Sequence, residues 1–277
     1  MDLAITATLW LVCAIILFRF GKRFGAQNPF TARWLIVGSI LLAAFLAWLS
    51  SGKLLWAQWV PLSFVVLLCN TFVILVVVAA GLLVGTHCLS ARRERMASIA
   101  LCTTAVLFLS SAAIRPMLEP LPAKLQENWV EAVCIQSHEA TCAPAAAATL
   151  LNLHGIAKTE RQMAAACLTS RSGTLALGTF RGLCIGTRDS RVRPRALVCS
   201  PEEYADSDLN RCLPLLAHVQ FEKDEVGHSV VVLERLEGGD WLIADPAVGM
   251  QQWSNSYFRR CWNGEGIFMV ARNLRSL

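Results

Sequence analysis

Charged residues are scarce in this sequence: they make up 16% of its 277 residues, whereas 55% are hydrophobic. Soluble globular domains average about 25% charged and about 45–50% apolar residues, which excludes a disordered chain, a collagen-like chain and a purely soluble enzyme. Acids are rarest in the first 115 residues, which hold two of them against nine Lys and Arg, a net charge of +7. Residues 116–277 hold sixteen bases and eighteen acids, a net charge of −2. Because a nucleic-acid-binding protein carries its basic surface on the soluble domain, we expect no nucleic-acid partner.

Long uncharged runs fill the first 115 residues, and a helix needs about 20 mostly apolar residues to cross a bilayer. They predict a transmembrane anchor in the lipid bilayer with four spans, at about residues 3–18, 34–50, 57–85 and 96–114. No Asp, Glu, Lys, Arg or His lies inside these runs. Since ionisable residues within a membrane mark transport pathways, anchoring is favoured over transport. Bases follow the first run and do not precede it, which indicates an uncleaved anchor and not a signal peptide.

The basic residues between the runs predict the orientation. The first and third loops hold four and three bases, and the second holds one, Lys53. Cytoplasmic loops carry the excess of Lys and Arg, so the first and third loops face the cytoplasm. An even number of spans then places residues 116–277 outside. We expect a multi-pass protein of a bacterial cytoplasmic (inner) membrane with an extracytoplasmic domain.

Cysteine is frequent in the second half, where residues 116–277 hold seven of the eleven. Such a density is unusual for a reducing compartment. An odd number is compatible with disulfide pairs and one reactive thiol. We therefore expect six of these cysteines to form three disulfides, with all fifteen connectivities open.

The segment 136–155, QSHEATCAPAAAATLLNLHG, places a cysteine at the start of a predicted helix. Pro144 suits a first helical turn and Gly155 the residue after a helix. Backbone N–H groups and the dipole at a helix N-terminus favour a thiolate, so Cys142 is a candidate nucleophile. Gln136 could turn its amide toward the sulfur as an oxyanion donor. From the position at a helix start alone, a buried or disulfide-bonded Cys142 is the favoured interpretation.

Strands are predicted farther along, at 213–221 and 228–236, and 241–244 leads into Asp245. Here His228 could take the thiol proton and Asp245 could orient the imidazole, which would complete a triad. A two-residue turn at Gly238–Gly239 would pair Asp245 with Val232, roughly 13 Å along the strand from His228. The triad therefore requires a wider loop, a shifted register or a bulge.

Other roles for these residues stay open at this point. Cys134, His138 and Cys142 have a spacing that could bind zinc, although structural zinc takes four ligands. The histidine at 218, in the middle of an apolar strand, is an alternative base but is more typical of the core. Asp245 could simply cap the turn that follows it.

Taken together, these motifs resemble the C39 peptidases, the papain-like cysteine proteases that process bacteriocins. The resemblance covers about residues 130–270: the Gln-to-Cys block, the intervening TERQMAAACLTSRSGTLALGTFRGLCIG, the blocks GHSVVVLERL and ADPAVG, and FRRCWNGEGIFMV. It implies Cys142 as nucleophile, His228 as base, Asp245 as orienting acid and Gln136 in the oxyanion hole, with no metal or cofactor. Two residues depart from the usual pattern, namely Ala143 where the family has Gly and Thr141 where Asp is common. No G-x-x-x-x-G-K-[ST] motif is present, so we expect no attached ABC transporter.

The expected fold is a four-helix transmembrane region, residues 1–115, followed by an α+β papain-like cysteine-peptidase domain, residues 116–277. In that domain N-terminal helices should pack on an antiparallel sheet, with a capping box at Thr159 and Gln162. The expected function is membrane-bound cleavage of a peptide or protein substrate. The alternative is a non-catalytic C39-like module that binds or sorts peptides for a separate export machinery.

Overall fold

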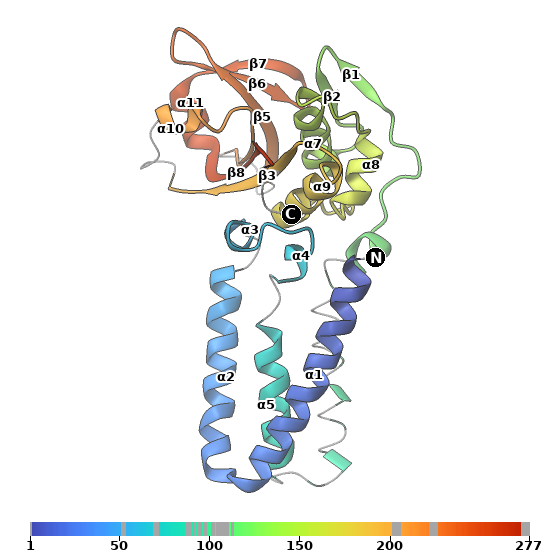
Figure 1. Cartoon of the computed structure of the whole chain (residues 1–277), viewed down its shortest axis with the longest axis vertical. Coiled ribbons are helices and arrows are strands. Elements are labelled where there is room, and N and C mark those ends of the chain that lie inside the picture. The colour runs from blue at the N-terminus through green and yellow to red at the C-terminus, as the bar shows by residue number, and fades with distance from the viewer. Residues whose placement is uncertain are drawn as a thin grey trace. The chain divides into compact units, whose positions relative to one another are not determined.

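The computed structural model describes residues 2–50, 54–68, 72–86, 90, 92–93, 96, 99–100, 103, 111, 114–200, 206–221 and 227–272 (Figure 1). These residues belong to two compact units. The first consists of Met1–Ser51 and Leu67–Ile114, and the second of Gly52–Val66 and Arg115–Leu277.

The first unit is built from apolar helices. Helix α1 (Asp2–Gln27) and helix α2 (Pro29–Ser50) follow each other with only Asn28 between them, and α5 (Val73–Gly85) packs against both. Among the described residues, one helix is long and apolar enough to cross a membrane, in the window Pro29–Leu46, and the 13 residues of α5 form a shorter apolar helix.

Helices α1 and α5 meet through glycine. A Cβ added at Gly85 would lie 2.2 Å from the carbonyl oxygen of Lys22, and one at Gly25 would lie 2.5 Å from that of Leu82. Gly81 and Gly21 make equally close contacts, so each helix presents two glycines four residues apart to the backbone of the other. Such small-residue pairs allow helix backbones to approach closely.

The predicted spans agree with these helices only in part. Three of the four bases expected in a first loop lie within α1, which continues to Gln27, and the fourth, Arg33, lies within α2. The span expected at 57–85 is divided into α3 (Leu55–Trp59), α4 (Val65–Leu68) and α5. Pro61 lacks the N–H that a continuous helix needs, and residues up to Val66 belong to the second unit. Most of the span expected at 96–114 lies outside the described residues.

The second unit combines helices with an antiparallel sheet, as the sequence predicted. Its sheet has the strand order β3-β8-β4-β5-β6-β7, and every pair of neighbours is antiparallel. The strands are β3 (Val192–Val198), β4 (Leu215–Val219), β5 (His228–Arg235), β6 (Trp241–Asp245), β7 (Gly249–Trp253) and β8 (Trp262–Ala271). Two further strands, β1 (Asn128–Val130) and β2 (Val133–Ile135), form a separate pair.

Helices α7 (Cys142–Leu153), α8 (Glu160–Ala166) and α9 (Ala176–Gly186) gather beside this sheet (Figure 1). Residues Ala143–Leu151 of α7 are all buried, and their alanines let the helix approach β5 closely. The predicted capping box of α8 is present, since the Thr159 side chain accepts from Gln162 N and the Gln162 side chain accepts from Thr159 N. The remaining short helices are α10 (Asp206–Asn210) and α11 (Asn255–Cys261).

The seven cysteines of the second unit carry thiols, and the three disulfides that the sequence predicted are not formed. Four of the seven are buried. Cys134 and Cys167 are at most 1% exposed, and Cys212 and Cys261 belong to the core cluster around Trp241 and Phe258. A buried cysteine is stable in such a site without a disulfide, so its frequency alone does not indicate disulfides.

Candidate active site

Cys142 is the first residue of α7, and a capped turn holds it there. The 3₁₀ helix η1 (Glu139–Thr141) precedes it, and the His138 ring at its N-cap accepts a hydrogen bond from Ala140 N at 3.1 Å. The Thr141 hydroxyl donates to His138 O at 2.7 Å. The thiol of Cys142 is half-buried at the N-terminus of the helix, as the composition of this segment predicted.

A buried carboxylate secures the loop before this turn. Glu160, which is 1% exposed, accepts from the backbone N of Ser137 at 2.9 Å and from its hydroxyl at 2.7 Å. Sequence reasoning missed this contact. Glu160 opens α8 directly after the capping Thr159, where an acid is ordinarily explained by the helix dipole, so nothing in the pattern indicated burial.

Strand β5 begins with His228, and β6 ends with Asp245. Val232 pairs with Ile243 and Arg235 with Trp241, with an irregularity after Val232. The connection therefore spans residues 236–240, and both a wider loop and a bulge resolve the spacing problem seen in the sequence. Continuing the register places Asp245 opposite Val230, where a diagonal neighbour two residues away is within side-chain reach.

The structure brings Cys142, His228 and Asp245 together. His228 Nε2 lies 2.8 Å from Asp245 Oδ1, and the two side chains are 14% and 7% exposed. Asp245 Oδ1 also accepts from Ala247 N at 2.8 Å. Burial lowers the pKa of His228, but its hydrogen bonds and charge interactions with Asp245 and Cys142 outweigh burial and raise that pKa to about 9. The imidazole is therefore stabilised in its protonated form.

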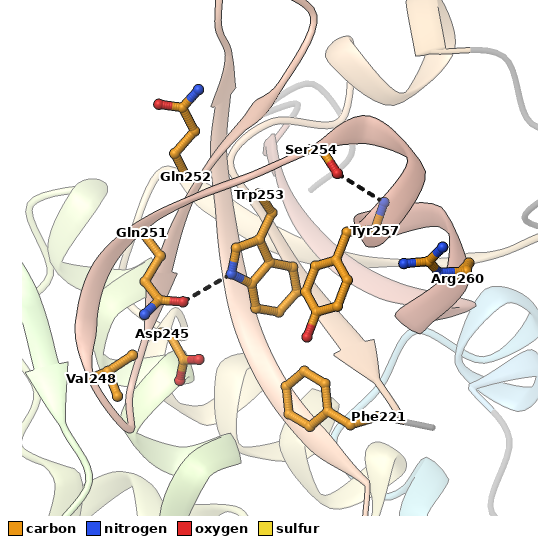
Figure 2. Close-up of a pocket in the computed structure, with 9 residues that line it drawn as sticks. All are labelled: Phe221, Asp245, Val248, Gln251, Gln252, Trp253, Ser254, Tyr257 and Arg260. Atoms are coloured by element: carbon orange, nitrogen blue, oxygen red, sulfur yellow. Dashed lines mark hydrogen bonds between the residues drawn. The ribbon is translucent and has the colours of Figure 1, made fainter. Parts of the chain in front are cut away.

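Aromatic rings cover the other side of this histidine. The ring centroid of Phe221 lies 5.7 Å from that of His228 and 6.0 Å from that of Trp253, and Trp253 lies 5.1 Å from Tyr257. Figure 2 shows the rings of Phe221, Trp253 and Tyr257 gathered beside an open pocket that Asp245 also lines. A hydrogen bond between charged groups is stronger where water is kept away, so these rings support the His228–Asp245 pair.

Cys142 and His228 open into a cleft of about 760 Å³. The other polar residues that line it include Glu139, Arg171, Ser172, His218, Asn263 and Glu265. A volume of this size lies in the range of ligand-binding clefts in proteins.

Of the four predicted site residues, Cys142 and His228 line this cleft, whereas Gln136 and Asp245 do not. The amide nitrogen of Gln136 donates to His138 O at 3.2 Å, and its Oε1 atom is buried without a partner. Its backbone N–H donates to Pro246 O at 2.8 Å, which ties the Cys142 loop to the residue after Asp245.

The rival interpretations have different outcomes. Among the described residues no three metal-binding side chains are grouped, and His138 uses its Nδ1 atom for the N-cap. His218 lies on β4 and its Nδ1 atom is 3.1 Å from Ser229 Oγ. Burial lowers the pKa of His218 to about 4, as expected for a neutral core histidine.

The family model for the Peptidase C39 family matches residues 131–273. A protein of Methanothermobacter thermautotrophicus, named only as uncharacterized, is 28% identical over 143 residues, which are 51% of this chain and 89% of that one.

Two solved structures are similar at lower identity. One is a double glycine motif protease from an AMS/PCAT transporter in complex with the leader peptide, with 22% identity, a TM-score of 0.41 and coverage of 54% of this chain and 94% of that one. The other is the peptidase domain of Streptococcus ComA, a bifunctional ABC transporter involved in quorum sensing, with 22% identity and a TM-score of 0.40. That match covers 55% of this chain and 100% of the other.

Proposed function

We propose a function from one premise: the chain belongs to the peptidase C39 family. The proposed activity is hydrolysis of a peptide bond by a Cys142–His228–Asp245 triad. The observation that carries it is the 2.8 Å contact between His228 Nε2 and Asp245 Oδ1, combined with a hydrogen bond from the same imidazole to Cys142. An imidazole held between a thiol and a carboxylate is the arrangement that activates a cysteine nucleophile.

In the proposed reaction the Cys142 thiolate attacks the carbonyl carbon of the scissile bond. The imidazolium of His228 gives its proton to the leaving amine, and a thioester to Cys142 remains. Neutral His228 then takes a proton from water, whose oxygen attacks the thioester and releases the carboxylic acid. Asp245 keeps the ring oriented and stabilises its positive charge throughout.

Gln136 is proposed to complete the oxyanion hole when substrate binds. Its amide lies close to the Cys142 loop through the contact with His138 O, and its buried Oε1 atom lacks a partner in the present orientation. A rotation of the side chain relieves that unsatisfied atom and directs an N–H group toward the developing oxyanion. Backbone N–H groups at the start of α7 are the other available donors.

The proposed location is the outer side of a cytoplasmic membrane, with four spans in residues 1–115. Two observations support this orientation. The second loop, residues 51–56, carries one base, and its residues from Gly52 onward belong, with the chain up to Val66, to the same compact unit as Arg115–Leu277. A loop and a domain that fold together lie on one side of the bilayer, whereas the bases of the other loops favour the opposite, cytoplasmic side.

The proposed substrate is a peptide, since the cleft that holds Cys142 and His228 has about 760 Å³ and is lined by both apolar and polar residues. Cleavage after a double glycine is the corresponding activity of the AMS/PCAT protease and supplies the first substrate to try. A separate export machinery is the proposed partner that delivers the peptide.

The experiment uses the full chain purified in detergent, a quenched peptide containing Gly-Gly and a quenched peptide library of mixed sequence. The wild type and the Cys184→Ala control should cleave a peptide and be alkylated by iodoacetamide at Cys142. The Cys142→Ala variant should do neither. Burial raises the pKa of Cys134, Cys167 and Cys184 to about 12, so these thiols should react slowly at neutral pH. Equal cleavage by Cys142→Ala contradicts the proposal.

One observation favours a second candidate function, peptide binding or sorting without turnover. Ala143 follows the nucleophile and the Gln136 amide faces His138 O, so the oxyanion hole is incomplete in the unliganded arrangement. A non-catalytic module would bind peptides from the library with the wild type and release no product over many hours. Its binding would be unchanged by His228→Ala.

The location has its own test. Protease added to the outer side of spheroplasts should digest residues 116–277, and protease added to inside-out vesicles should leave them intact. The opposite result places the domain in the cytoplasm.

A further inference from the structure

Two segments next to predicted spans lie against the walls of the cleft. One, residues 54–66, follows α2, and the other, residues 115–125, follows the apolar run 96–114. We call them the membrane-proximal segments. Both belong to the second compact unit, which contains the residues matched by the peptidase C39 family model and which we call the peptidase unit.

The second of these segments holds one wall through Glu119. This wall is the loop between α8 and α9, where Arg171, Ser172 and Gly173 line the cleft. The Glu119 carboxylate accepts hydrogen bonds from the hydroxyls of Ser172 and Ser170, and its carbonyl oxygen accepts from Arg171 N at 3.0 Å. The hydrogen bond from Ser172 is the main cause that lowers the pKa of Glu119.

The first segment holds the opposite wall. The backbone N–H of Leu54 donates to Oε1 of Glu265 at 3.0 Å, and Glu265 lines the cleft. Leu54 itself is fully buried. Farther along, the Gln58 amide reaches Val198 O at 3.5 Å, and Val198 is the strand partner of Glu265. The segment therefore contacts both the side chain and the strand pair that carry this wall.

We propose that Glu119 and Leu54 are positioning residues for the two walls of the peptide cleft, so that the membrane-proximal segments set how tightly the substrate binds. This inference rests on the proposed peptidase function. Neither residue lines the cleft, and each acts through a residue that does, Ser172 or Glu265. The membrane-proximal segments are then a part of the substrate site.

The contacts predict an effect on binding and not on chemistry. The wall at 170–173 is a short bridge between Ser170 and Gly173, and the φ of 98° at Gly173 makes it a tight turn. Without Glu119 its conformational freedom increases, and the substrate must order it on binding. Cys142, His228 and Asp245 keep all their contacts, so the chemical step should not change.

The first experiment measures KM and kcat for the quenched peptide that the full-length wild type cleaves. Glu119→Ala should raise KM about two- to tenfold, the range that one lost hydrogen bond produces, with kcat unchanged. Ser172→Ala should also raise KM, and the double variant should raise it by less than the product of the two single effects, because both single variants remove the Ser172–Glu119 hydrogen bond. Glu119→Gln keeps an acceptor and should restore most of the binding. Glu237→Gln, in the exposed turn after β5, is the control.

The second experiment removes the donor on the other wall. Leu54 has a φ of −65°, which proline adopts, so Leu54→Pro deletes the N–H without requiring a new backbone angle. It should raise KM to a similar extent as Glu119→Ala. When Glu265→Ala is already present, Leu54→Pro should raise KM no further. Leu54→Ala separates the lost side chain from the lost N–H and should retain a lower KM than Leu54→Pro.

Alkylation of Cys142 by iodoacetamide reports on the triad in every variant. An unchanged alkylation rate with raised KM supports the inference. An unchanged KM in both Glu119→Ala and Leu54→Pro overturns it, as does a fall in kcat together with slower alkylation, because the residues would then act on the triad or the fold. If the wild type itself fails to cleave, the proposed function has failed, which is a different result from cleavage with unaltered KM.

Discussion

Different kinds of contact stabilise the interior of each of the two units of this protein. Helices α1 and α5 approach through Gly25 and Gly85, so that backbone lies directly on backbone. The peptidase unit instead relies on polar side chains that fix loops, such as Glu160 on Ser137, around a core rich in aromatic rings. Lipid tails are as apolar as the side chains of a membrane helix, so apolar burial does not drive two such helices together. Close packing of small residues contributes to their association instead. In water, burial of apolar surface and satisfied hydrogen bonds dominate.

This contrast separates the proposed triad from the helix contacts. The proposed triad lies in the peptidase unit, and the glycine contacts lie in the other. Substitutions at the glycine contacts should therefore leave the intrinsic reactivity of the peptidase unit unchanged.

The largest expected effect comes from removing the base. His228→Ala should lower kcat/KM by at least about a thousandfold, since it removes both the proton acceptor and the cation that stabilises the thiolate. The far-UV circular dichroism and the α1–α5 contact should be unchanged. A loss of less than tenfold would assign proton transfer to another residue.

The next largest effect concerns the α1–α5 pair in the first unit. Gly85→Leu should destabilise the α1–α5 pair by about 1–3 kcal/mol or more, because its side chain collides with the Lys22 backbone. Cross-linking between cysteines placed on α1 and α5 would measure the loss. Gly38→Leu is the matched control, because an added Cβ there meets nothing within 4 Å. Slower alkylation of Cys142 in Gly85→Leu would show that the two units are not independent.

The sequence predicted local features better than features that depend on tertiary contacts. The start of α7 followed from Pro144 and the alanine run, because helix signals are local. His228 and Asp245 were identified as partners, but the bulge after Val232 that brings them together depends on tertiary pairing and left no pattern. Hydropathy misjudged residues 57–66, because an apolar segment buried against a domain reads like one buried in lipid. Leu54 and Ala57, at most 1% exposed in the peptidase unit, illustrate the ambiguity.

Two further features of the structure could not be predicted from the sequence, for physical reasons. The paired glycines of α1 and α5 carry no hydrophobic signal, and only the structure shows which helix faces which. The cysteine count favoured disulfides, whereas Cys134 and Cys167 serve as buried apolar groups, a role that composition does not distinguish.

A smaller effect concerns the rings over the triad. Phe221→Ala should admit water to the His228–Asp245 hydrogen bond and lower the pKa of His228 from its value of about 9. The alkaline limb of kcat should shift downward by up to about one pH unit, since proton donation to the leaving amine requires the imidazolium. Phe221→Leu, which still covers the pair, should shift it less. Identical pH profiles would show that the rings do not shield the triad.

The smallest effect is a change of stability with pH, and it should be confined to the peptidase unit. The pKa of His228 is raised in the fold to about 9, above the about 6.5 of an unfolded histidine. Its protonated form therefore stabilises the fold fully below about pH 6.5, and this contribution disappears as the pH rises through about 9. The melting temperature of the wild type should fall by a few degrees more than that of His228→Gln between these two pH values. Because the α1–α5 contact consists of glycines, backbone and apolar side chains that do not titrate, cross-linking between those helices should not change over the same interval. A parallel change in both units would contradict their separation.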